Sequence, residues 1–354
     1  MKTSKNIGLF LVISSILGNH GFAAQQAQQQ TYTSTVILSA PWGQKNLYMD
    51  KELSSPGEFG IFDPYTREPN AVDQGPIQGP STFTVAPNGD IYIVDTFNNR
   101  IQRFTQNGSF VSSLPAAGSG WVEDIAVDAN GNIYLLYLGP AAVWKVDPSG
   151  NLLKVIYMFE LGDKDGEGMS YGGGSTRLYC DKSGRLFLSY YKANERAQAV
   201  FQFGTTTTEF TPVQQKASLR KGSAGASGLI LNKNMLFQII GGEMSSVDNS
   251  GKSITEFKSL GSYSFLDVDS LNNAYLTSYN MENNIYSIRK QTPDGIIIST
   301  FEWKYPRYQL PSPHTPTVVD TKKELTIDAQ GNVYVLGLTN SGLTITKWSP
   351  SGGK

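Results

Sequence analysis

The feature that most constrains this chain is an aromatic position that recurs six times in the same local setting. Each aromatic follows a glycine or asparagine by three positions, and the six are Tyr92, Tyr134, Phe187, Phe237, Tyr275 and Tyr334. Val, Ile or Cys stands seven positions before each, and a large apolar residue stands nine before in five of the six copies. Because residues two apart on a strand share a face, this phase predicts one buried sheet face in every copy.

The first copy, residues 83–110, has the pattern of four short strands separated by turns that contain Asn-Gly pairs. Successive aromatics lie 42, 53, 50, 38 and 59 residues apart, a spacing typical of the four-stranded blades of a β-propeller. Six such sheets arranged radially bury their faces against one another, which one sheet alone cannot do. We therefore predict an all-β fold, a six-bladed β-propeller with four-stranded antiparallel blades. Two stacked β-sandwiches are the alternative, but they give no reason for a sixfold phase.

The two ends of the repeat region complement each other in their number of strands. The last copy ends at Lys354 after three strands, and Thr33–Leu38 is an additional strand ahead of the first copy. We expect this N-terminal strand to complete the sixth blade and close the ring. Residues 31–354 then form one domain, although a length of 354 residues would by itself suggest two.

The first 24 residues have the pattern of a signal peptide. Lys2 and Lys5 precede an apolar run, Ile7–Leu17, that is too short to span a bilayer, and small residues follow it. Residues 25–30 (QQAQQQ) form a Gln-rich leader that we expect to be disordered. An uncleaved anchor is the alternative. We expect an exported monomer, periplasmic or secreted, with no transmembrane segment after cleavage.

Charge and cysteine content exclude several classes of protein. The formal net charge is −1, and it becomes −3 when residues 1–24 are removed, so a strongly basic nucleic-acid binder is excluded. A single cysteine, Cys180, excludes a disulfide scaffold. It occupies a position held by Val or Ile in the other copies, so we expect a buried, unreactive thiol rather than a nucleophile. Residues 172–175 (GGGS) lie between predicted strands, which argues against a phosphate-binding loop ahead of a helix.

The first copy resembles the NHL repeat. The resemblance rests on residues 86–108 (APNGDIYIVDTFNNRIQRFTQNG) and on the shorter stretches 127–134 (VDANGNIY) and 327–334 (IDAQGNVY). It extends over about 320 residues as six units, of which the later ones depart from the pattern. The family implies a six-bladed propeller but no single activity, since its members include protein- and RNA-binding platforms as well as enzymes.

Enzymes with similar propellers offer a test of the residues. Amidating lyases hold zinc through histidines and streptogramin-lyase-like propellers depend on histidine, whereas His314 is the one histidine after residue 24. Sugar-lactonase-like propellers hold Ca²⁺ through carboxylates and an asparagine in the channel. The alternative function is therefore a divalent-cation-dependent, lactonase-like hydrolase or lyase with Asp124, Glu324 and Asp267 as oxygen ligands.

The innermost strand of each copy should begin about ten residues before the aromatic, so these positions are expected to surround one mouth of the central channel. They are Thr82, Asp124, Arg177, Ser227, Phe265 and Glu324, with Glu123 and Asp267 beside them. We interpret them as a ligand or cation site, and the alternative is a solvated channel lining whose charges pair with one another. Arg177 would repel a metal ion and argues against calcium at this position.

The long connectors between copies should emerge on the same face as this channel mouth. They are residues 48–80, 157–176, 205–226 and 301–323, and long loops in a compact fold are commonly functional. Residues 301–316 contain Trp303, Tyr305 and Tyr308 among four prolines, which suits the anchoring of a protein, peptide or glycan ligand. Packing of this connector onto the blades is the alternative.

One connector has an acidic segment, residues 162–168 (GDKDGEG), with carboxylates at alternating positions like the start of a calcium loop. The glutamate expected at the twelfth position is Gly174 instead, so a solvated acidic turn is the alternative. We recognise no catalytic set. The sequence favours a binding module that needs no cofactor, with Ca²⁺ the one cofactor that these carboxylates suggest.

Overall fold

The computed structural model describes the repeat region in separate stretches of chain. They are residues 30–45, 54–66, 76–116, 121–137, 142–157, 177–180, 185–192, 197–203, 210–212, 229–232, 235–240, 243–247, 253–257, 264–292, 295–310, 317 and 319–351. Within these stretches the chain is all-β, with two short 3₁₀ turns, η1 (Pro64–Thr66) and η2 (Thr96–Asn98), and no α-helix. No helix in the described part has the length and apolar character that crossing a bilayer requires.

Five of the described sheets have four strands each, and consecutive strands pair antiparallel. They are β3 (Thr82–Val85), β4 (Ile91–Asp95), β5 (Arg100–Phe104) and β6 (Phe110–Pro115) in the first sheet; β7 (Val122–Val127), β8 (Ile133–Tyr137), β9 (Ala142–Val146) and β10 (Leu152–Tyr157) in the second; β11 (Arg177–Cys180), β12 (Leu186–Lys192), β13 (Ala197–Phe203) and β14 (Phe210–Pro212) in the third; β15 (Leu229–Asn232), β16 (Met235–Ile240), β17 (Glu243–Val247) and β18 (Ser253–Phe257) in the fourth; and β19 (Ser264–Val268), β20 (Ala274–Asn280), β21 (Ile285–Gln291) and β22 (Ile297–Lys304) in the fifth.

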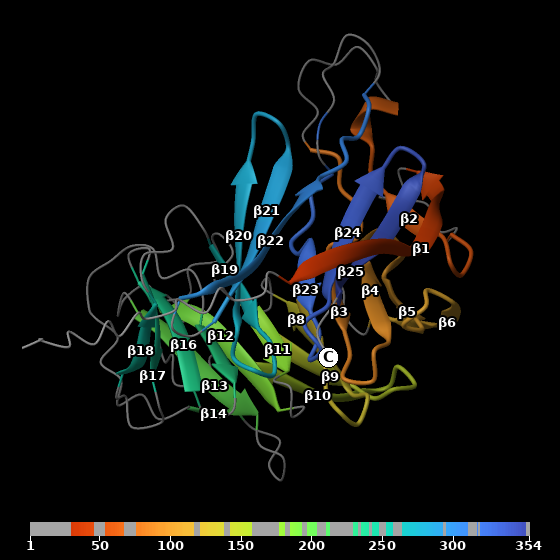
Figure 1. Cartoon of the computed structure of the whole chain (residues 1–354). Coiled ribbons are helices and arrows are strands. Elements are labelled where there is room, and N and C mark those ends of the chain that lie inside the picture. Colours follow the sequence, from red (N-terminus) through yellow and green to blue (C-terminus); the bar gives the residue numbers. More distant parts are fainter. Residues whose placement is uncertain are drawn as a thin grey trace, which may run out of the picture.

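The sixth sheet combines strands from both ends of the chain, in the order β2-β1-β25-β24-β23. Its strands are β1 (Thr31–Lys45), β2 (Phe59–Ile61), β23 (Leu325–Ile327), β24 (Val333–Thr339) and β25 (Gly342–Ser351). β1 pairs antiparallel with β25 from Thr31 to Pro41, and β2 pairs parallel with the other edge of β1 at Trp42 and Lys45. Figure 1 shows β1, in red, lying along β25, in blue.

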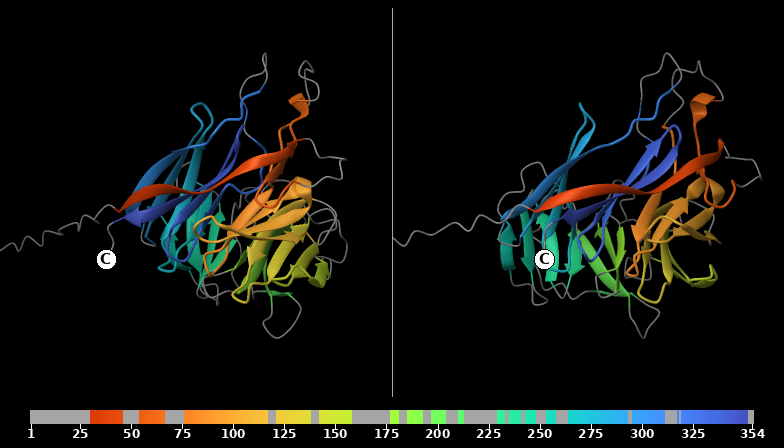
Figure 2. Two further views of the ribbon diagram at one scale, coloured as in Figure 1. Left: turned by 90° about the vertical axis from the view of Figure 1, so that its right-hand side faces the viewer. Right: turned by 45° about the vertical axis from the view of Figure 1, so that its right-hand side comes forward.

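The sheets follow one another in space in the order of the chain. β7 contacts β3 on one side and β11 on the other, β15 contacts β12 and β19, and β19 contacts β23. β23 in turn contacts β3, so the last sheet lies against the first. Figure 2 shows the succession of sheets from two sides, with the N-terminal strand crossing the outside.

The recurrent aromatic forms the core that its phase predicts. Wherever its side chain is described it is at most 2% exposed, as in Tyr92, Tyr134, Phe187, Tyr275 and Tyr334. In four sheets a cation from the paired residue of the third strand covers the ring at 5.3–5.7 Å from its centroid. These pairs are Arg103 on Tyr92, Lys145 on Tyr134, Lys290 on Tyr275 and Lys347 on Tyr334. Each such pair contributes about 0.5–1 kcal/mol.

A turn with a half-buried aspartate holds the hydroxyl of this aromatic in the second and sixth sheets. Oδ1 of Asp128 accepts the backbone N–H of Asn132, and Oδ2 accepts the amide of Asn132 and the hydroxyl of Tyr134, each at 2.9–3.0 Å. The same arrangement recurs at Asp328 with its asparagine and tyrosine. Since every partner lies within six residues, the stretches VDANGNIY and IDAQGNVY specify this turn locally, and the buried hydroxyl is satisfied.

Some predictions fall outside the described residues, and one needs correction. Residues 1–29, Ser227 and the acidic segment 162–168 lie outside the described part of the chain. Cys180 was expected to be buried, but it is half-buried. The physical reason is its place as the last residue of β11, at the end of the strand, whereas Leu178 two residues earlier is 1% exposed.

Candidate functional site

The candidate site lies where the first strands of the sheets begin. The connector that leads into β23 runs beside the one that leads into β3, since the N–H of Asp320 donates to Ile77 O and that of Lys322 to Ser81 O, both at 2.7 Å. In Figures 1 and 2 the tip of the β20–β21 hairpin points to the same side of the molecule as η1. These elements together define one face, which we call the channel-mouth face.

Asp124, predicted to line the channel mouth, is 3% exposed and is surrounded by protein groups. Its carboxylate accepts the backbone N–H of Leu178 on β11 at 2.9 Å and lies 3.3 Å from Nζ of Lys323. Thr82 on β3 donates to it at 3.5 Å. Asp124 therefore links the starts of β3, β7 and β11 to the connector before β23. Its ion pair with Lys323 is the kind of charge pairing expected of a channel lining without a ligand.

The remaining predicted channel residues are spread around the face. Glu123 lies 3.9 Å from Lys322, and burial raises the pKa of Glu123 while that lysine opposes the shift. Arg177 is exposed, and half-buried Asp267 accepts the N–H of its own neighbour, Val268, at 2.7 Å. In the described part of the chain, no three His, Cys, Asp or Glu side chains are placed to share a metal ion.

An aromatic row crosses the fifth sheet near this face. Tyr279, Tyr286 and Trp303 are directly paired neighbours on β20, β21 and β22. Their rings stack, with centroids 4.6 Å apart for the first pair and 5.8 Å for the second. Tyr279 at one end is 39% exposed, whereas Tyr286 and Trp303 are half-buried. Tyr305 packs edge-on against Trp303 at 5.0 Å and is 2% exposed.

Glu324 contacts this aromatic row from the start of the sixth sheet. The hydroxyl of Tyr286 donates to Oε2 of Glu324. Burial raises the pKa of Glu324, as does the nearby Asp320 carboxylate, while the hydrogen bond from Tyr286 lowers it. The structure thus brings together Glu324, Trp303 and Tyr305, three of the predicted site residues. Sequence reasoning missed Tyr279 and Tyr286, which belong to an ordinary hairpin and carry no motif.

In the described part of the connector after β22, the aromatics Tyr305 and Tyr308 are held by contacts within the protein. Trp303 belongs to β22 itself rather than to the connector. The backbone of Tyr305 forms two hydrogen bonds with Asn284: its N–H donates to Asn284 O, and its carbonyl accepts the side-chain amide of Asn284. Tyr308 is 1% exposed and its hydroxyl donates to Oδ2 of Asp63 at 2.9 Å. Tyr305 and Tyr308 therefore pack this connector onto the protein. The aromatic surface available to a ligand belongs instead to the row of Tyr279, Tyr286 and Trp303, at the exposed ring of Tyr279.

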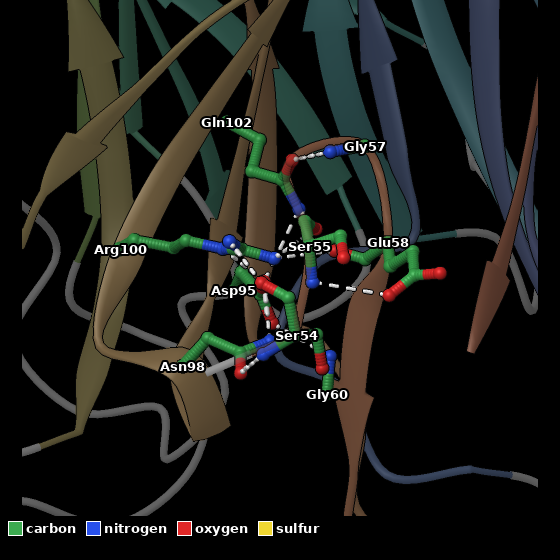
Figure 3. A network of polar contacts seen from close by, with 9 residues as sticks. All are labelled: Ser54, Ser55, Gly57, Glu58, Gly60, Asp95, Asn98, Arg100 and Gln102. Carbon is green, nitrogen blue, oxygen red and sulfur yellow. Dashed lines mark hydrogen bonds and ion pairs between the residues drawn. The ribbon is translucent and has the colours of Figure 1, made fainter. Parts of the chain in front are cut away.

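A second polar cluster, around Asp95 and Arg100, is structural (Figure 3). The Asp95 carboxylate is fully buried and accepts Nε of Arg100 at 2.8 Å, the Asn98 amide at 2.7 Å and the Gly60 N–H at 2.9 Å. Arg100 then donates to three backbone carbonyls, those of Ser54, Ser55 and Glu58. Burial raises the pKa of Asp95, and the Gly60 N–H and Arg100 oppose this shift. The cluster fastens residues 54–60 onto the first sheet.

One family model and several solved structures resemble this chain. The NHL repeat model matches residues 78–104, which contain β3, β4 and β5, and no curated protein sequence matches the chain. Solved structures that align include a streptogramin B lyase (12% identity, 93% of this chain and 100% of that chain, TM-score 0.46) and a gluconolactonase from Xanthomonas campestris (13%, 93% and 93%, 0.46). A virginiamycin B lyase from Staphylococcus aureus also aligns (13%, 91% and 99%, 0.45). The first sheet of this all-β protein thus contains an NHL repeat.

Proposed function

We propose that the protein is an exported six-bladed NHL-like β-propeller that binds a protein, peptide or glycan ligand through its channel-mouth face. Support for the closed ring comes from the contact of β23 with β3 and from the pairing of β1 with β25. Support for export to the periplasm or the exterior comes from the signal-peptide pattern of residues 1–24.

The observation that carries the binding proposal is the aromatic row and its open end. Tyr279 stacks on Tyr286 with one face of its ring and is 39% exposed, and Met281 at the tip of the same hairpin is 78% exposed. Rigid aromatic side chains lose little conformational entropy on binding and provide large contact areas, which is why they dominate binding surfaces. A row held by cross-strand pairing is preorganised, so a ligand pays little to order it.

A binding screen against peptidoglycan, glycans and exported proteins tests this proposal. Tyr279→Ala should weaken binding of the partner found by at least tenfold, because truncating a hot-spot aromatic costs about 2 kcal/mol or more and about 1.4 kcal/mol corresponds to a factor of ten. The matched control is Tyr157→Ala, since Tyr157 on β10 has nearly the same exposure, 40%, at a place away from the row. Equal binding by the wild type and both variants would refute the assignment of the face.

The ring proposal has its own test in a deletion of residues 31–40. The deletion removes the β1 partners of β25 from Thr31–Ser351 through to Ala40–Leu343 and so exposes the edge of the sixth sheet. We expect the melting temperature to fall sharply or cooperative unfolding to disappear, while removal of residues 1–29 alone should leave the melt unchanged. An unchanged melt after the 31–40 deletion would show that β1 does not close the ring.

A further inference from the structure

The cluster around Glu324 contains a buried polar group that the protein does not satisfy. The hydroxyl of Tyr305 is buried and has no hydrogen-bond partner in the described residues. Burial raises the pKa of Tyr305 well above its ordinary value, and the carboxylate of Glu324 and the hydroxyl of Tyr286 add to this effect, so the three groups share one environment. A buried hydroxyl without a partner destabilises the protein, and a ligand that hydrogen-bonds to it would remove that penalty.

The same cluster carries negative charge without a matching cation. In the described part of the chain, no Lys, Arg or His side chain forms an ion pair with Glu324 or Asp320. The two lysines of this connector, Lys322 and Lys323, lie instead against Glu123 and Asp124. Arg307 is exposed, and its charge acts to lower the pKa of Tyr279. It is not among the groups that shift the pKa of Glu324.

Elsewhere this protein completes a similar arrangement with an ammonium group of its own. In the fifth sheet Nζ of Lys290 lies 5.3 Å from the centre of the Tyr275 ring and 3.0 Å from Oδ2 of Asp269, and the hydroxyl of Tyr275 also faces that carboxylate at 3.5 Å. At Tyr286 and Glu324 the tyrosine and the carboxylate are present and hydrogen-bonded. The cation is the component that the chain itself does not supply there.

We propose that the aromatic row with Tyr305 and Glu324 binds a primary alkylammonium group, the lysine side chain of a protein or peptide ligand. Aromatic ring faces attract cations, most strongly where the site is partly desolvated, and the carboxylate supplies the opposing charge. A primary ammonium donates three hydrogen bonds, so it can also reach a phenolic oxygen, whereas a quaternary ammonium donates none. Exposed Tyr279 and Met281 offer apolar contacts to the methylene chain of the lysine.

This inference rests on the proposed function, because it names the chemistry recognised at the same face. In the test, a blocked Gly-Lys-Gly peptide is added to the full mature chain up to millimolar concentration, and binding is monitored by NMR. The companion peptides replace the lysine with norleucine or trimethyllysine, and free glucosamine is a fourth probe. We expect the lysine peptide to bind at least tenfold more tightly than the norleucine peptide. Binding of norleucine with equal affinity, or tighter binding of trimethyllysine or glucosamine, would overturn the assignment.

The protein variants sharpen this test. Glu324→Gln should reduce affinity for the lysine peptide at least tenfold, since it removes the charge and keeps an oxygen that accepts the Tyr286 hydroxyl. The control is Glu302→Gln, the same change at an exposed position of β22, which should bind as the wild type does. Undiminished binding by folded Glu324→Gln would refute the inference. If no lysine peptide binds while Tyr279→Ala still abolishes binding of a screened partner, the inference fails and the proposed function stands.

Discussion

Replacing Arg100 with glutamine tests how the segment before the first sheet is held. The ion pair with Asp95 has a length of 2.8 Å, and the two side chains are 8% and 0% exposed. Removing the arginine leaves the Asp95 carboxylate buried without its cation and frees the carbonyls of Ser54, Ser55 and Glu58. Loss of one partner of a buried ion pair costs about 3–5 kcal/mol, so we expect the free energy of unfolding to fall by about that amount.

Urea denaturation followed by tryptophan fluorescence measures this change, and the first sheet offers a matched control. Arg103 and Asp90 also form an ion pair, 2.5 Å long, but their side chains are 29% and 14% exposed. Ion pairs near the surface contribute about 0.2–1 kcal/mol, and the cation–π contact of Arg103 with the Tyr92 ring contributes about 0.5–1 kcal/mol, so Arg103→Gln should cost about 2 kcal/mol or less. Limited proteolysis should cut residues 54–60 faster in Arg100→Gln than in Arg103→Gln.

A double variant separates the loss of contacts from the unpaired charge. Asp95→Asn combined with Arg100→Gln leaves no buried charge at this place. It should therefore be less destabilised than Arg100→Gln alone. If Arg100→Gln lost less than about 1 kcal/mol, or no more than Arg103→Gln, the argument that burial makes this pair important would be refuted.

Two further predictions concern a turn and a carboxylate. Gly108 and Gly295 have similar positive φ angles, +78° and +87°, but a Cβ on Gly108 would lie 1.8 Å from a β1 carbonyl oxygen while one on Gly295 meets open space. Gly108→Ala should therefore destabilise the protein by about 1–3 kcal/mol more than Gly295→Ala in urea denaturation, and equal losses would contradict the contact. Burial and Asp320 raise the folded-state pKa of Glu324 above its ordinary value of 4.5, with the Tyr286 hydrogen bond opposing. The folded state then retains a proton that the unfolded state releases, so stability falls as pH rises from about 4.5 through the folded pKa. Glu324→Gln should flatten this dependence, and identical slopes in urea denaturation between pH 4 and 7 would contradict it.

Much of the repeat could be predicted because its signals are local. The aromatic of each copy, its turn residue and its apolar partners lie within ten residues of one another, so period-two alternation identifies the buried face of a strand pair. Tyr134 and Tyr334 are buried where this phase places them. The aspartate turn beside each is equally local, since the carboxylate, asparagine and tyrosine lie within six residues.

Other features depend on variable or long separations and leave no such pattern. The cations that cover the recurrent aromatics come from the third strand, and the separation changes with the hairpin length, from Tyr134–Lys145 to Tyr275–Lys290. Arg100 binds residues more than forty positions earlier. The tyrosines of the connector, Tyr305 and Tyr308, are buried, and the sequence does not indicate which side chains of a connector pack against the sheets.

The sequence by itself determined the strand repeat, its core phase and the placement of Asp124 and Glu324 near the starts of inner strands. Only the tertiary structure decided what those carboxylates contact: Asp124 meets Lys323 and a neighbouring strand, whereas Glu324 meets Tyr286. The physical reason is that strand periodicity follows from backbone geometry over a few residues. Burial and charge pairing follow from whichever distant segment packs against a side chain, and a contact between sheets has no fixed spacing in the sequence.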